Sequence, residues 1–170
     1  MRSPLPLALA ALAALCACSS SRSQECPGEE VARLRLTGAL VEAACAVDPA
    51  GGYAALVPAT LTLDLTFSFD AAGGAALCNG KALAAPLTGT HDGDALVVSL
   101  ETTGGVLSGC ASTCAVTTDQ QVAGSLLRDG TGAVIGFSGT LTDRQAATAS
   151  ATCGACTTPC TATWALATAP

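Results

Sequence analysis

Residues Thr60 to Phe69 read TLTLDLTFSF, an unbroken alternation of polar and apolar side chains. Successive side chains of a β-strand point to opposite faces, so a period of two places all the apolar members on one face. The pattern therefore predicts a strand with one buried and one exposed face. The apolar members are Leu61, Leu63, Leu65, Phe67 and Phe69.

Turn signals follow this strand at short intervals. Residues 70–74 predict a turn, and Asn79-Gly80 supplies the positive φ angles of a tight hairpin. Further hairpins are predicted at Asp92-Gly93 and at residues 129–132. The arms of the first hairpin are residues 87–90 and a strand that carries Leu96, Val98 and Leu100 on one face. The arms of the second are residues 121–128 and 133–142. Trp164 and Leu166 mark a last strand. In the arm 133–142 the residues expected on one face are Ala133, Ile135, Phe137, Gly139 and Leu141.

Residues 29–47 fit two patterns. Arg33-Leu34-Arg35-Leu36 alternates as a strand does, and Gly38 discourages a helix interior. The spacing of Val31, Leu34, Val41 and Cys45 also suits one face of a helix. We favour the strand.

The number and spacing of these elements predict the fold class. Seven to nine strands with turn signals between them indicate an all-β antiparallel meander, closed as a small barrel or packed as a sandwich. Strands do not alternate with long helical patterns, so a doubly wound α/β fold is not expected.

Composition narrows the classes of function. The 170 residues suit one domain; half are hydrophobic and 12% are charged, unlike a disordered chain. A net charge of −6 argues against nucleic-acid binding through a basic face. The only histidine, His91, stands beside Asp92 and Asp94 at a predicted hairpin tip. We interpret His91 as an exposed turn residue. We interpret the two carboxylates as residues that form the turn rather than as calcium ligands. With no Gly-x-Ser-x-Gly motif either, we expect no enzyme and no cofactor.

The first residues have the features of an export signal. Arg2 supplies positive charge, and residues 7–15 form a run of Leu and Ala. This run is too short to span a bilayer, which requires about 20 helical residues. Residues 1–17 are therefore expected to be a signal peptide, and an ordinary secretory cleavage after Ala17 is one possible outcome.

The end of this segment, Leu15-Cys16-Ala17-Cys18, resembles the lipobox of bacterial lipoproteins. The resemblance implies that Cys18 becomes the lipid-modified amino terminus. Ser19 stands where Asp holds some lipoproteins at the inner membrane, so the resemblance implies the outer membrane or the cell surface. Residues 18–25 then form the lipidated cysteine and a Ser-rich tether, and residues 26–170 a single β domain.

Ten cysteines in an exported chain predict disulfides. With Cys16 removed and Cys18 lipidated, eight remain, enough for four bridges in a core of small side chains. They are Cys26, Cys45, Cys78, Cys110, Cys114, Cys153, Cys156 and Cys160. Cys110 with Cys114, and two of the last three, are close enough in sequence to bridge locally. The alternatives are a redox pair, Cys153 with Cys156, and a metal site, for which zinc would take Cys110, Cys114, Cys153 and Cys156.

Together these observations predict a non-enzymatic envelope protein that meets the membrane through its lipid, binds no nucleic acid and has a structural or binding role. Its protein or small-ligand partner stays open. In one alternative the barrel carries a small apolar ligand against the apolar face of residues 60–69. We favour the view that this face fills the core.

Overall fold

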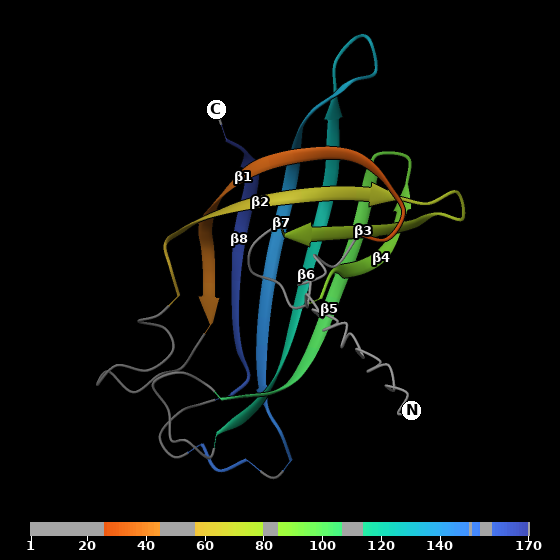
Figure 1. Cartoon of the computed structure of the whole chain (residues 1–170). Helices are drawn as coiled ribbons and strands as arrows, with labels where there is room; N and C mark the ends of the chain where they lie inside the picture. Colours follow the sequence, from red (N-terminus) through yellow and green to blue (C-terminus); the bar gives the residue numbers. More distant parts are fainter. Residues whose placement is uncertain are drawn as a thin grey trace, which may run out of the picture.

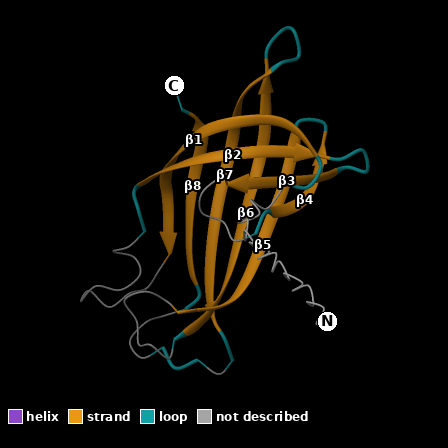
Figure 2. Cartoon of the chain, in the orientation of Figure 1, coloured by secondary structure: helices purple, strands orange, loops and turns teal. Residues whose placement is uncertain are grey.

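The computed structural model describes residues 26–44, 57–79, 85–106, 114–149, 151–153 and 158–169. Within these ranges the chain forms eight strands and no helix, as Figures 1 and 2 show. No described helix is therefore long and apolar enough to cross a membrane. The strands are β1 (Glu29–Ala44), β2 (Thr60–Phe69), β3 (Gly74–Asn79), β4 (Leu87–Asp92), β5 (Ala95–Val106), β6 (Ala115–Arg128), β7 (Val134–Ala147) and β8 (Cys160–Thr168).

The eight strands form one closed antiparallel barrel. Each strand is hydrogen-bonded to the next along the chain, and β8 returns to β1. This topology confirms the all-β meander and selects the barrel over the sandwich. Closure pairs the backbone groups that edge strands would expose.

β1 is the strand that closes the barrel. Its residues Glu29–Ala39 pair with β2, and Leu36–Ala44 pair with β8. Figure 1 shows β1 bending sharply between these two partners. A Cβ on Gly38 would lie 2.6 Å from the Leu61 side chain and 3.0 Å from that of Leu166, so a glycine lets three strands approach closely here. The strand predicted for this region is confirmed, and the helical alternative is wrong.

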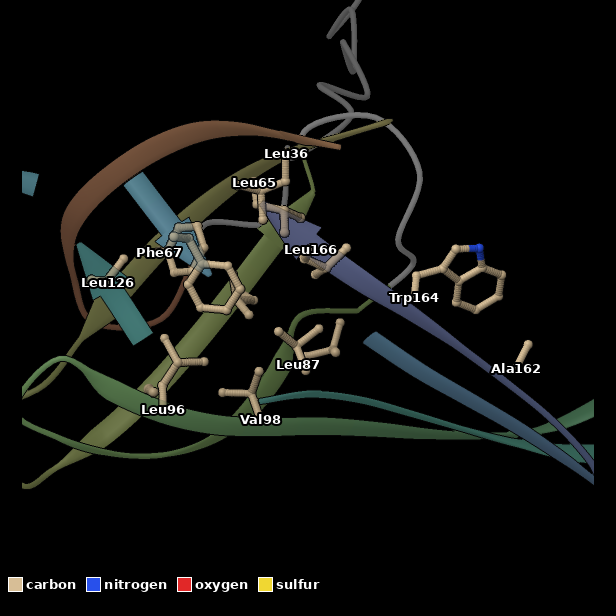
Figure 3. Packing of buried hydrophobic residues seen from close by; sticks show 14 residues of the cluster. Leu36, Leu65, Phe67, Leu87, Leu96, Val98, Leu126, Ala162, Trp164 and Leu166 are labelled. Atoms are coloured by element: carbon tan, nitrogen blue, oxygen red, sulfur yellow. The ribbon is translucent and has the colours of Figure 1, made fainter. Parts of the chain in front are cut away.

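The predicted apolar face of β2 points into the barrel. Leu65 and Phe67 are buried, and the other three members pack against the core while partly exposed. The Phe67 ring lies 5.2 Å from the Phe137 ring, centroid to centroid. Figure 3 shows apolar side chains of β1 and β2 facing those of β4 and β5. The buried core comprises Leu36, Leu65, Phe67, Ala75, Leu77, Leu87, Leu96, Val98, Val122, Leu126, Phe137, Ala162, Trp164 and Leu166.

β7 departs from the predicted alternation at one residue. Leu127 of β6 pairs with Gly136 and Arg128 pairs with Val134, so Ile135 is an extra residue in the ladder. This bulge turns Ile135 outward, where it is 59% exposed, and the prediction that it faces the core with Phe137 is wrong.

Carboxylates hold two of the predicted turns. Asp70 Oδ1 accepts hydrogen bonds from the backbone of Ala72 and Gly74, both at 2.8 Å. Asp129 Oδ1 does the same for Thr131 and Ala133, at 2.9 and 3.0 Å. These turns and the one at residues 93–94 are confirmed.

The tight hairpin predicted at Asn79-Gly80 is wrong. Leu77 pairs with Leu87, so residues 78–86 lie between the two partners. The β3–β4 connection is therefore far longer than a two-residue turn.

The residues before β1 are fastened to the outside of the barrel. Cys26 forms a disulfide with Cys78 of β3, with 5.8 Å between the Cα atoms. This bridge reaches across β2, since β2 lies between β1 and β3. Ser68 and Ala76 are only 1% and 3% exposed although they share the outward side of β2 and β3 with Cys78. The segment ahead of β1 therefore adds a second layer to this wall.

Candidate functional site

The two ends of the barrel differ in the length of their connections. At one end, the turn end, residues 70–73, 93–94 and 129–133 join the strands. At the other, the loop end, the connections are residues 45–59, 80–86, 107–114 and 148–159. Loops carry binding residues more often than tight turns do, so a binding site is expected at the loop end.

A pocket of about 70 Å³ lies inside the barrel toward the loop end. Its walls are mostly apolar, and the polar residues Asn79 and Gln120 also line it. The lining residues are Leu63, Leu65, Leu77, Asn79, Leu87, Gln120, Val122 and Leu141. Two of them belong to the predicted apolar face of β2, so part of that face lines a cavity while the rest fills the core.

Short strands β3 and β4 form the wall beside this pocket. β3 pairs with β2 only through Leu65–Phe69, and β4 pairs with β5 only through Ala95–Ser99. The first half of β2 and the second half of β5 thus extend past these short strands toward the loop end.

A layer of polar side chains lies next to the pocket, inside the barrel. Gln120 of β6 and Asp143 of β7 are cross-strand partners, one inward position beyond the pair Val122 and Leu141. The Gln120 Nε2 donates a hydrogen bond of 3.3 Å to Asp143 Oδ2. Gln145, the next inward residue of β7, also hydrogen-bonds the Asp143 side chain. We call Gln120, Asp143 and Gln145 the polar layer.

Asp143 has an unsatisfied oxygen. Its Oδ1 is buried and accepts no hydrogen bond from any residue that the structure describes. Burial raises the pKa of this carboxyl above its ordinary value of 3.8, the charge of Asp119 raises it further, and the hydrogen bonds from Gln120 and Gln145 oppose the shift. A buried polar atom without a partner is uncommon in a folded protein and calls for a functional or structural reason.

The raised pKa makes stability depend on pH. The folded chain keeps the Asp143 proton to a higher pH than the unfolded chain, so the free energy of unfolding falls as pH rises from 3.8 through the folded-state pKa. We expect Asp143→Asn to remove this decline, because asparagine does not titrate. Urea unfolding between about pH 4 and pH 7 measures it. The matched control is Asp119→Asn, which removes an exposed carboxylate on the neighbouring position and should retain most of the decline. If the free energy of unfolding declined equally with pH in wild type and Asp143→Asn, the raised pKa of Asp143 would be contradicted.

Disulfide-bonded cysteines lie at the loop end. Cys114, which is fully buried, pairs with Cys153, and Cys160 is disulfide-bonded as well. Cys114 therefore does not bridge locally to Cys110, because β6 and the end of β7 bring residue 153 beside it. The same bridge shows that the zinc site and the redox pair are wrong. The zinc site would need Cys114 and Cys153 as free thiolates, and the redox pair would need Cys153 to bond with Cys156. Cys18, Cys45, Cys110 and Cys156 lie outside the described residues.

His91 lies at the turn end, away from the polar layer. Its ring stacks on that of Phe69 at a centroid distance of 3.9 Å, and its Nδ1 lies 3.2 Å from the Gly93 carbonyl oxygen. It is therefore half-buried, not the exposed turn residue that the sequence predicted. Asp94 forms an ion pair of 2.7 Å with Arg128. Among the described residues, no group of three His, Cys, Asp or Glu side chains is arranged to hold a metal ion.

The polar layer was missed because two predicted strand boundaries fell one residue short of it. The predicted arms began at Gln121 and ended at Thr142, whereas β6 starts at Ala115 and β7 continues to Ala147. Extending the alternation of Gly139 and Leu141 by two residues reaches Asp143. That polar continuation of an apolar face was the available signal.

No protein-family model, curated protein or solved structure matches this chain.

Proposed function

We propose that the chain is a lipid-anchored envelope protein whose barrel is a binding module, not an enzyme, with its ligand site at the loop end. The pocket between β2, β3, β4, β6 and β7 and the adjoining polar layer support this role most directly. No nucleic-acid partner is proposed, because the chain is acidic.

A purely structural barrel would be more stable without the polar layer. Leaving a buried acceptor without a hydrogen bond costs about 1–3 kcal/mol. An apolar side chain in place of Asp143 would remove this penalty and extend the core beyond Leu141. The unsatisfied Asp143 Oδ1 is therefore the observation that favours binding over a structural role.

The pocket volume limits the size of the ligand. Sites for drug-sized molecules usually have about 300–1,000 Å³, whereas this pocket has about 70 Å³. Phe67, Phe137 and Leu36 fill the described part of the barrel toward the turn end and are fully buried. The pocket suits a small molecule or one end of a longer ligand.

The anchor is proposed at Cys18, as the lipobox implies. Residues 19–25 would link it to Cys26, whose disulfide to Cys78 joins the tether to the barrel wall rather than to the pocket. Two or more acyl chains give durable membrane attachment. The outer membrane or the cell surface is the proposed location.

Membrane fractionation and intact mass test the anchor. The wild-type chain, expressed in a bacterium, should enter the membrane fraction with the mass of a diacylglycerol-modified chain that begins at Cys18. Cys18→Ala should be exported without this mass. A wild-type chain cleaved after Ala17 and carrying an unmodified thiol would show an ordinary secretory signal instead.

Binding of n-butanol, followed by NMR chemical shifts of the Leu and Val methyl groups, tests the pocket. We expect shifts at Leu63, Leu77 and Leu141, and their loss in Val122→Phe, which fills the cavity. Val97→Phe is the matched control, because Val97 is 49% exposed on the outside of β5. Absence of shifts in the wild type, or their persistence in Val122→Phe, would refute a ligand site here.

A further inference from the structure

We propose that the site selects ligands with a small cationic group, such as a primary alkylammonium, which enters the apolar pocket and is neutralised by the Asp143 carboxylate. This inference rests on the proposed function and adds the chemical class of the ligand.

The hydrogen-bonding capacity of the polar layer favours a donor. An ionised carboxylate only accepts hydrogen bonds, and Asp143 Oδ1 receives none from the described residues. Gln120 connects the two parts of the site, since it lines the pocket and its Nε2 donates to Asp143 Oδ2 at 3.3 Å. A donor group bound beside Gln120 would find an acceptor that no described residue uses.

Within the described ranges, no arginine or lysine side chain lies inside the barrel to compensate the charge of Asp143. The described arginines lie on the outward positions of their strands: Arg33 and Arg35 have side chains 75% and 68% exposed, and Arg144 alternates with Asp143. Arg128 is paired with Asp94 at the turn end. Charged groups in protein interiors are normally paired, and a ligand ammonium would supply the missing partner.

The inward-facing side chains that the structure describes on the strands around Asp143 do not titrate in acid. β6 presents Gln120 and Thr118, β5 presents Leu100 and Thr102, and β8 presents Ala162 and the disulfide-bonded Cys160. Asp119 is the neighbouring charge, on the outward side of β6. Among the described residues that face the polar layer, a change in ligand selectivity in acid therefore reports Asp143.

The test compares n-butylammonium with n-butanol, using the same NMR titration of the oxidised protein at pH 7. A hydrogen bond to a charged group favours the amine by about tenfold or more in Kd. Asp143→Asn should abolish this preference, and the matched variant Asp119→Asn should keep it. In wild-type protein the preference should also disappear as pH falls below the Asp143 pKa, since butylammonium stays charged there; this arm needs no variant to fold.

The outcomes distinguish failure of the cation selectivity from failure of the binding site itself. If butanol binds but the amine has no advantage, or if the advantage survives in Asp143→Asn or in acid, the cation inference is wrong and the pocket remains. If neither probe binds the wild type, the proposed binding function fails, and the inference fails with it. A tenfold preference that depends on Asp143 establishes both.

Discussion

Replacing Phe137 with alanine is expected to lower the free energy of unfolding by about 3–5 kcal/mol. Phe137 is fully buried, its ring lies 5.2 Å from that of Phe67, and it covers the cross-strand pair Gly124 and Gly139. Neither glycine has a side chain that could fill the space left by the ring. For a domain of this size the loss corresponds to a fall in Tm of roughly 6–20 °C, measurable by circular dichroism.

The matched control lies two residues away on the same strand. Ile135→Ala removes a side chain that the bulge turns outward, and it should change the unfolding free energy by no more than about 0.5 kcal/mol. Similar losses in the two variants would show that the bulge is placed wrongly and that Ile135, not Phe137 alone, contributes to the core.

Removing the Cys26–Cys78 bridge is expected to cost roughly 2–4 kcal/mol of stability. The two cysteines are 52 residues apart, so the bridge restricts a long loop of the unfolded chain. It also holds residues 26–28 against the outer side of β2 and β3. Urea unfolding of Cys26→Ser/Cys78→Ser, with intact mass confirming that the other bridges have formed, measures the effect.

A change beside the bridge separates this effect from disturbance of the surface. Glu30→Ala breaks the ion pair with Arg33, both of whose side chains are well exposed, and should matter far less than loss of the bridge. A double cysteine variant as stable as the wild type would mean that the segment before β1 adds nothing to the barrel.

The strands of this protein were predictable because their alternation is a local property. Leu61 to Phe69 needed no knowledge of the fold, and the turn at Asp70 follows from a carboxylate that bonds its own backbone. Barrel closure was not predictable, since it depends on β1 pairing with β2 through its first part and with β8 through its last part. The bulge at Ile135 arises from the β6–β7 register, which the sequence of β7 alone does not contain.

The disulfide Cys114–Cys153 and the polar layer also depend on how strands pair along the barrel. Cys114 and Cys153 become neighbours only when β6 and β7 pair, and proximity in sequence suggested Cys110 instead. The predicted strand ended at Thr142, one residue before Asp143. The place of Asp143 inside the barrel follows from the register that sets it opposite Gln120.

The most direct test of the account is a titration of the Asp143 carboxyl carbon by NMR in the protein without ligand. The structure predicts a midpoint above the ordinary value of 3.8, because burial disfavours the carboxylate. Asp129 provides an internal reference of opposite sign, since hydrogen bonds from Thr131 lower its pKa below that value. A midpoint for Asp143 above 3.8 and above that of Asp129 supports a buried, under-bonded carboxyl at the loop end. A midpoint at or below 3.8 would contradict it, and with it the basis for a binding site in this part of the barrel.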